Sequence, residues 1–214
     1  VLISPPDPAA ALVWAPGAGV PAHGHIEHLL AYGESGYAVL VVDIRGNGGK
    51  TPGHPLDMEA DYTTLLSGGW PQVYLIAADL IMGERYLHDR FGTVPVWVVG
   101  ESNGGRYAAQ AAAADPHFSG YVGISTSGFS LRGEEYTGQA RRFLLSVDPQ
   151  ALAGHIAPRP ALLFHSPRDP VIPLAAGEEL ADAFGEDGEW FLFNGTHGVD
   201  GEVDRLLLIE LNSR

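Results

Sequence analysis

The sequence contains no cysteine and a single lysine, Lys50, among its 214 residues. The absence of cysteine excludes disulfide bonds, thiolate metal sites and a cysteine nucleophile, and it leaves the redox compartment open. The scarcity of lysine contributes to a formal net charge of -14. Because so acidic a surface repels nucleic acid and anionic lipid, we expect neither a nucleic-acid partner nor a membrane partner.

Long apolar runs are also missing: none approaches the roughly 18 residues that a membrane-spanning helix requires. The stretch "VLISPPDPAA" lacks the basic flank and the apolar core of a signal peptide. The chain begins with Val1 rather than methionine, which leaves open whether a segment precedes it. We expect one soluble domain over residues 1–214, with the cytoplasm favoured as its compartment and the oligomeric state undetermined.

Short apolar runs alternate with helical patterns along most of the chain. The predicted strands are 11–15, 38–43, 94–100, 121–125, 161–165 and 190–193. The predicted helices are 26–35, 73–90, 105–114, 175–184 and 203–211. The strands are apolar on both faces, which is typical of strands covered by helices on each side. The pattern therefore predicts an α/β fold with a mostly parallel sheet and helices on both faces.

Two segments interrupt this alternation. Residues 45–70 are rich in glycine, threonine and proline, and we expect a long loop there. Residues 127–158 precede the next strand and are partly helical in pattern. Insertions of this size in a compact domain are often binding loops or lids. We interpret 127–158 as a small cap.

The segment "VPVWVVGESNGGRYAAQAAA" carries the strongest chemical signal. An apolar strand leads directly into Gly100-Glu101-Ser102-Asn103-Gly104, and an alanine-rich helix follows. This is Gly-x-Ser-x-Gly between a strand and a helix, the context that a nucleophilic serine on a strained turn requires. The motif predicts that Ser102 presents an exposed hydroxyl at a helix N-terminus, where negative charge is favoured.

A serine hydroxyl needs a base, and the base needs an orienting acid. Asp169 follows a buried strand in "ALLFHSPRDPVIP", and His197 follows the next strand in "EWFLFNGTHGVDGE". The carboxyl ends of parallel strands meet at one edge of a sheet, so we expect both residues to lie near Ser102. Their order along the chain is Ser, Asp, His.

These motifs together resemble the α/β-hydrolase family over nearly the whole chain. "GESNGG" is similar to its nucleophile elbow, "HSPRDPVIP" to its acid loop, "NGTHG" to its histidine loop and "VVDIRGNGGKT" to the turn after its fourth strand. The resemblance implies Ser102 as nucleophile, His197 as general base and Asp169 as its orienter. Asn103 stands where His, Gln or Met is frequent, and the chain begins so late that the family's first one or two strands are expected to be absent.

The loop "APGAGVPA" at residues 15–22 admits two interpretations. Its glycines nearly match a dinucleotide fingerprint, and Asp43 lies at the spacing of a ribose-binding acid, which would suit an NAD-dependent dehydrogenase. The resemblance instead implies that the backbone N–H groups of Ala18 and Asn103 form an oxyanion hole. Pro21 supplies no N–H for a phosphate, so we favour the oxyanion hole and interpret Asp43 as a turn residue.

Other local patterns are weaker. "GNGGKT" fails as a phosphate-binding loop, since Ile44 stands where glycine is required. His23, His25 and His28 cluster without an obvious carboxylate to complete a metal site, so we expect exposed or cleft-lining histidines and no metal. Glu101 should point away from Ser102 in a tight turn, and we expect it to pack or to pair with Arg106.

The sequence thus predicts a serine hydrolase that needs no cofactor and cleaves a small soluble substrate, with a carboxylic ester favoured. Phe129, Tyr136 and Phe143 in the cap are the expected pocket wall. The alternatives are an aminopeptidase or amidase, a non-catalytic binding protein on a hydrolase scaffold, and the dehydrogenase. An aminopeptidase would need a carboxylate for the substrate amine; the candidates are Glu59, Asp61, Glu134 and Glu135.

Overall fold

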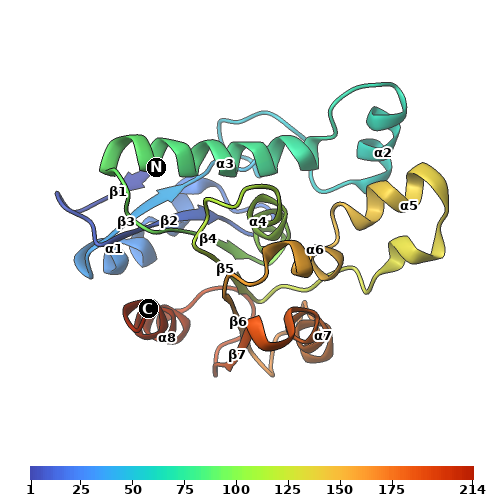
Figure 1. The fold of residues 1–214 in the computed structure, drawn as a ribbon. Coiled ribbons are helices and arrows are strands. Elements are labelled where there is room, and N and C mark those ends of the chain that lie inside the picture. Colours follow the sequence, from blue (N-terminus) through green and yellow to red (C-terminus); the bar gives the residue numbers. More distant parts are fainter.

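The computed structural model describes residues 1–214 and shows one seven-stranded sheet with helices on both faces (Figure 1). The strand order is β1-β3-β2-β4-β5-β6-β7, and only the pairing of β1 with β3 is antiparallel. The strands are β1 (Leu2–Ile3), β2 (Ala10–Ala15), β3 (Tyr37–Val41), β4 (Val96–Glu101), β5 (Gly120–Ile124), β6 (Ala161–His165) and β7 (Gly188–Leu192). The predicted α/β class is confirmed.

Eight α-helices and three short 3-10 turns connect the strands. The helices are α1 (Ile26–Glu34), α2 (Met58–Leu66), α3 (Gln72–Phe91), α4 (Asn103–Ala114), α5 (Gly138–Leu145), α6 (Pro149–Ile156), α7 (Leu174–Phe184) and α8 (Gly201–Asn212). The 3-10 turns are η1 (Ala22–His25), η2 (Arg132–Glu135) and η3 (Gly185–Asp187). No helix combines the length and the apolar character needed to cross a membrane.

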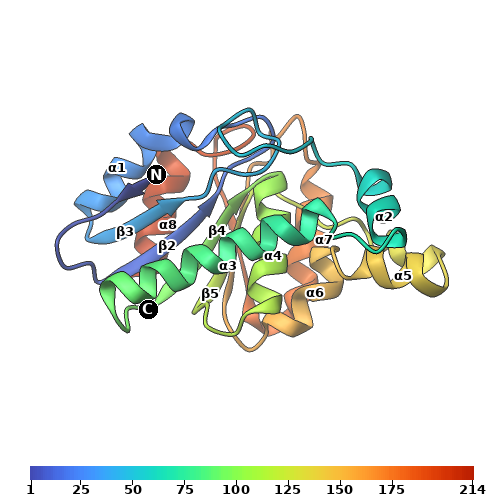
Figure 2. The ribbon, with the colours of Figure 1, turned by 90° about the horizontal axis from the view of Figure 1, so that it is seen from above.

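The sheet separates two hydrophobic cores, and successive residues of β2 alternate between them. Ala11 and Val13 face the core that α3, α4, α6 and α7 complete, whereas Leu12 and Trp14 face the core under α1 and α8. Figures 1 and 2 show these helices on opposite sides of the strands. Because both faces are covered, the central strands are apolar throughout, which is why their sequence lacks a polar alternation.

All predicted strands and helices are present, with bounds that shift by at most two residues. The prediction of an uninterrupted loop over residues 45–70 is wrong, because α2 lies within it. Asp57 caps α2 by accepting hydrogen bonds from the N–H groups of Glu59 and Ala60. Asp61 of α2 in turn accepts the N–H groups that begin α3. These contacts join α2 to α3. The helix was not predicted because a segment of nine residues is too short for its apolar periodicity to stand out.

The N-terminal strand is short. Leu2 and Ile3 pair antiparallel with Leu40 and Val39 and so form the edge of the sheet. The predicted cap, residues 127–158, divides in two. Helix α6 packs into the core, while η2 and α5 extend from the body beside α2 (Figure 2).

The sheet has a switch point between β2 and β4. The chain passes from β2 outward to β3 and then returns to build β4 on the other side of β2. Ligands of open α/β sheets bind outside the carboxyl ends of the strands at such a point. The segments that follow β2 and β4 begin at Pro16 and Ser102, so both lie at this switch point.

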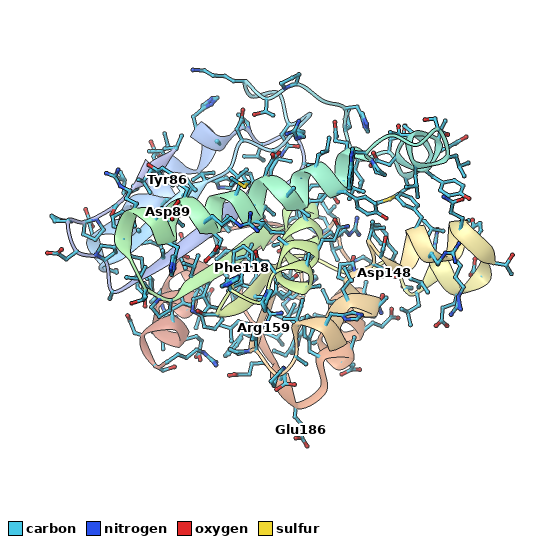
Figure 3. All side chains as sticks on the ribbon, turned by 45° about the horizontal axis from the view of Figure 1, so that its top comes forward. Tyr86, Asp89, Phe118, Asp148, Arg159 and Glu186 are labelled. Atoms are coloured by element: carbon cyan, nitrogen blue, oxygen red, sulfur yellow. The ribbon has the colours of Figure 1, made fainter.

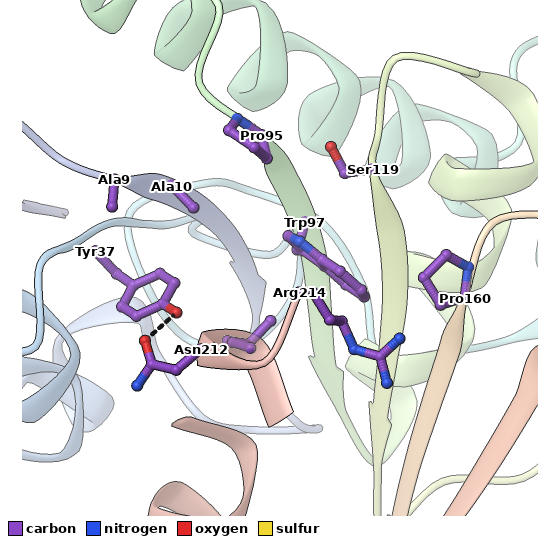
Figure 4. Close-up of a pocket in the computed structure, with 10 residues that line it drawn as sticks. Ala9, Ala10, Tyr37, Pro95, Trp97, Ser119, Pro160, Asn212 and Arg214 are labelled. Carbon is purple, nitrogen blue, oxygen red and sulfur yellow. Dashed lines mark hydrogen bonds between the residues drawn. The ribbon is translucent and has the colours of Figure 1, made fainter. Parts of the chain in front are cut away.

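The opposite edge of the sheet carries a cavity of about 580 Å³ at the amino ends of the strands (Figure 4). Tyr37 and Trp97 line it, and the hydroxyl of Tyr37 donates a 2.8 Å hydrogen bond to Oδ1 of Asn212. No predicted site residue lines this cavity, so it is separate from the switch point at the carboxyl ends of the strands.

Candidate active site

Ser102 forms a one-residue turn between β4 and α4. Its φ of 52° and ψ of -121° are values that residues other than glycine rarely adopt. A Cβ at Gly100 would strike the backbone of Gly104, and a Cβ at Gly104 would strike the carbonyl oxygen of Ala15. The two glycines therefore allow α4 to begin directly against the end of β2, with Ser102 at its N-terminus.

The loop after β2 lies against this turn. A Cβ at Gly17 would lie 3.4 Å from Cβ of Ser102, so the loop that carries the next residue, Ala18, is close to the serine turn. The N–H of Ala18 makes no hydrogen bond within the protein. The N–H of Asn103 begins α4 and has no intrahelical partner. Two backbone donors without protein partners thus border Ser102, as the oxyanion-hole hypothesis requires.

Asn47 holds this loop in place. Its Nδ2 donates to the carbonyl oxygens of Gly17 at 2.8 Å and Val20 at 3.3 Å, and its Oδ1 accepts the N–H of Gly19 at 3.3 Å. Asn47 is 9% exposed, so water competes little for these bonds. The side chain fixes the carbonyl oxygens on either side of Ala18, and with them the direction of the Ala18 N–H.

Asp169 and His197 form a close pair. Nδ1 of His197 lies 2.8 Å and 3.0 Å from the two carboxylate oxygens of Asp169. Asp169 also accepts the N–H groups of Val171 at 2.8 Å and Ile172 at 2.9 Å. Burial alone would raise the pKa of Asp169, but these N–H bonds and His197 hold the pKa below its usual value. The carboxylate stays ionised and fixes the orientation of the His197 ring.

Glu101 connects the histidine loop to the serine turn. Its carboxylate packs directly against Gly198, the residue after His197. The imidazole of His197 also contributes to lowering the pKa of Glu101. Ser102 and His197 share no hydrogen bond in this structure, a contact that in free enzymes often tightens only when substrate binds.

Glu101 pairs with His25 rather than with Arg106. Nε2 of His25 lies 3.0 Å from Oε2 of Glu101, and both side chains are largely buried. Burial would raise the pKa of Glu101, but the contact with His25 lowers it below the usual value. The expected pair with Arg106 is wrong, because α1 and η1 bring His25 under the serine turn, which the sequence could not show.

The other histidines of this segment have separate roles. His28 lies 2.9 Å from Asp204 of α8, and Tyr32 donates to the same carboxylate at 3.0 Å. His23 is exposed and lines a cavity of about 540 Å³ with Lys50. The expectation of exposed or cleft-lining histidines therefore fits His23 but not the buried His25.

The sequence matches no known family model, and no curated protein matches it. Solved structures do match it over nearly its whole length. TT1662 from Thermus thermophilus superposes with a TM-score of 0.75 at 21% identity, covering 99% of this chain and 91% of that one. The α/β hydrolase GrgF from Penicillium sp. sh18 gives 0.68 at 17% identity, with coverage of 99% and 91%. The acetyl xylan esterase from Paenibacillus sp. R4 gives 0.74 at 18% identity, with coverage of 99% and 78%.

The chain has the α/β-hydrolase fold. The resemblance drawn from the sequence motifs is confirmed at the level of the fold. The identities are too low to transfer an activity, which must be argued from the site itself.

Of the three expected pocket residues, Tyr136 and Phe143 lie together in one groove, and Phe129 lies elsewhere. Phe143 is 2% exposed and packs between Tyr62 and Tyr74, at ring distances of 5.5 and 5.9 Å. Tyr136 and Phe143 line an apolar groove of about 340 Å³ between α2 and α5, and Ser102 does not line it. Phe129 lies instead under the guanidinium of Arg106, 4.5 Å from its ring centre.

Sequence reasoning missed Asn47 and His165. Asn47 stands between Gly46 and Gly48, which both have positive φ, so the run of glycines was a signal of a tightly formed turn. His165 is 1% exposed, with Nε2 3.0 Å from the carbonyl oxygen of Ile172 and 3.9 Å from Asp169. It therefore holds the loop that carries Asp169 against the end of β6. Because it is the last residue of an apolar strand, no sequence motif marked it as functional.

We predict that Gly104→Ala destabilises the α/β-hydrolase fold by about 1–3 kcal/mol, because the added methyl would overlap the backbone at the end of β2. Gly154→Ala is the matched control: it also lies in a helix, and its Cβ would meet nothing within 4 Å. The control should leave stability unchanged or raise it by up to about 1 kcal/mol. Urea denaturation measures both, and equal effects would contradict the steric account.

We predict that the stabilisation from the Asp169 carboxylate depends on pH. Since folding lowers its pKa, this stabilisation is complete above the unfolded pKa of about 3.9 and is lost as the pH falls through the folded pKa. In thermal unfolding, the Tm of Asp169→Asn should be lower than that of the native protein at pH 7, and this difference in Tm should narrow below about pH 4. Asp182→Asn, at an exposed position of α7, is the control. A gap that widens in acid would mean that burial keeps Asp169 protonated.

Proposed function

We propose that this protein is a serine hydrolase of small carboxylic esters, with Ser102, His197 and Asp169 as its catalytic residues. The observation that carries the proposal is the close His197–Asp169 pair at the edge of the sheet where Ser102 forms a strained turn beside two backbone N–H groups without protein partners. The structural neighbour that is an acetyl xylan esterase supports ester cleavage.

The proposed reaction proceeds in two halves. His197 removes the proton of the Ser102 hydroxyl as Oγ attacks the carbonyl carbon of the ester, and the N–H groups of Ala18 and Asn103 bind the resulting oxyanion. His197 then returns the proton to the departing alcohol, which leaves an acyl-Ser102 intermediate. A water molecule, deprotonated by His197, attacks the acyl carbon, and His197 returns the proton to Oγ of Ser102 as the acyl bond breaks, which releases the carboxylic acid and restores the serine hydroxyl.

The carboxylate of Asp169 stays ionised throughout. It holds Nδ1 of His197 as the protonated nitrogen, so Nε2 is the one that accepts the proton of Ser102. The hydrogen bonds from Val171 and Ile172 keep the carboxylate in position while the charge of the imidazole changes.

The dehydrogenase hypothesis fits the structure less well. Within the glycine loop, the N–H of Gly19 donates to Asn47 and the N–H of Val20 donates to Gly17, so few donors remain for a pyrophosphate. Asp43 accepts three hydrogen bonds from Lys50 and Thr51, which leaves it occupied as a turn residue rather than available to a ribose.

The aminopeptidase hypothesis has little support among its candidate carboxylates. Asp61 is 2% exposed and accepts the first N–H groups of α3, so it cannot receive a substrate amine. Glu134 lies 3.7 Å from Arg141 on the outer side of the cap. No observation favours Glu59 or Glu135 over the other acidic residues. Ester cleavage is therefore the function that the site supports best.

The first test is covalent labelling. The native protein should gain the mass of one fluorophosphonate adduct, and Ser102→Ala should gain none and should lose at least about 1,000-fold in kcat on p-nitrophenyl esters. Ser130→Ala is the control, since Ser130 also has positive φ but binds Glu179 on the surface. A folded native protein that takes no adduct would favour the non-catalytic scaffold.

We further predict that Asn47→Ala lowers kcat by about 10-fold with little change in KM. Loosening the Ala18 N–H weakens oxyanion binding in the transition state without altering the ground-state contacts. Steady-state kinetics on p-nitrophenyl acetate measures both constants. Asn194→Ala, which removes an exposed asparagine bonded to Glu202, is the control. An increase in KM alone would show that Asn47 shapes substrate binding instead.

A further inference from the structure

Arg106 lies four residues after Ser102 on α4 and carries a charge that the proposed reaction does not use. Residues four apart on a helix are neighbours, with Cβ atoms about 5–6 Å apart. The guanidinium is held by neutral groups: Nη1 donates to Oδ1 of Asn103 at 3.0 Å, while Nε and Nη2 donate to the carbonyl and hydroxyl oxygens of Ser127 at 3.1 and 3.0 Å. The ring of Phe129 lies beneath it.

Arg159 provides an internal comparison (Figure 3). Its guanidinium makes five hydrogen bonds to backbone carbonyl oxygens, on Ala112, Asp115, Phe118, His155 and Ile156. A guanidinium has five N–H donors, so Arg159 is saturated by the fold. Arg106 makes three hydrogen bonds, which leaves two of its N–H donors without a protein partner.

No carboxylate of the protein pairs with Arg106. The carboxylate whose charge acts on it is that of Asp148, and Asp148 is occupied by the backbone N–H groups of Phe129, Leu131 and Gln150. Burial lowers the pKa of Arg106, because the guanidinium has lost water without gaining an ion pair. In a chain of net charge -14, a partly buried cation left without a carboxylate beside the serine turn is unusual.

We propose that Arg106 binds a carboxylate of the substrate, so that the protein acts on esters whose acyl group carries a second, free carboxylate. This proposal rests on the proposed ester hydrolysis at Ser102. The substrates are then monoesters of short dicarboxylic acids: the ester carbonyl reaches Ser102 while the distal carboxylate accepts the two free N–H groups of Arg106. Planar guanidinium and carboxylate groups suit such paired hydrogen bonds.

The test compares two esters of equal acyl chain length, p-nitrophenyl hemiglutarate and p-nitrophenyl valerate. The native protein should favour the hemiglutarate in kcat/KM. Arg106→Met, which retains an apolar side chain over Phe129, should lower that preference by about 10- to 100-fold, as expected for the loss of hydrogen bonds to a charged group. Arg106→Lys should retain part of the preference, because it keeps the charge but not the planar pair of donors.

Ser127→Ala separates anion binding from a tethering role. It removes one hydrogen bond between Arg106 and the loop after β5 but leaves the guanidinium charge, so the preference should remain. If Arg106→Met and Ser127→Ala change the preference equally, or if Arg106→Met leaves it unchanged while both esters are hydrolysed, Arg106 is a tether and the proposal is overturned.

Glutarate binding tests the anion site without catalysis. Glutarate should raise the Tm of Ser102→Ala more than butyrate does. Adding Arg106→Met to that variant should make the two Tm shifts equal. If the native protein hydrolyses neither ester while glutarate still binds through Arg106, the proposed hydrolysis fails and the carboxylate site stands. If the esters are hydrolysed and glutarate has no effect beyond that of butyrate, the carboxylate site fails and the hydrolysis stands.

Discussion

The turn at Ser102 is the constraint on which the rest of this site depends. A residue with positive φ between β4 and α4 requires that Gly100 and Gly104 carry no side chains, since either methyl would strike backbone. Because these two glycines have no side chains, α4 can begin against the end of β2, and the loop after β2 reaches Ser102. One steric condition therefore places the hydroxyl, the helix N-terminus and the neighbouring N–H groups together.

Aspartate side chains that accept backbone N–H groups fix the loops around this turn. Asp43 closes the loop that carries Asn47, Asp169 holds its own turn beside His197, and Asp148 fastens the segment that contains Phe129. These three aspartates thus have a structural use at the carboxyl edge of the sheet. Hydrogen bonds from N–H groups hold the pKa values of Asp43 and Asp169 below the usual range, so these two loops are ordered by charge as well as by packing.

The electrostatic balance of the site is uneven on its two sides. On the side of α1, the carboxylate of Glu101 is matched by His25 in the interior. On the side of the cap, Arg106 meets only neutral oxygens and an aromatic ring. The carboxylate site that we propose uses this open side at Arg106, whereas the apolar groove between α2 and α5 is a separate feature of the cap.

The sequence by itself determined six of the seven strands, five of the eight α-helices and the order Ser102, Asp169, His197, because apolar periodicity and turn chemistry are local properties. Tertiary structure alone decided which side chains meet: Glu101 with His25, Asn47 with the loop after β2, and α2 with α3. These contacts join segments far apart in the chain, and a short helix such as α2 forms only when its partners are in place. Local pattern carries no information about such pairings.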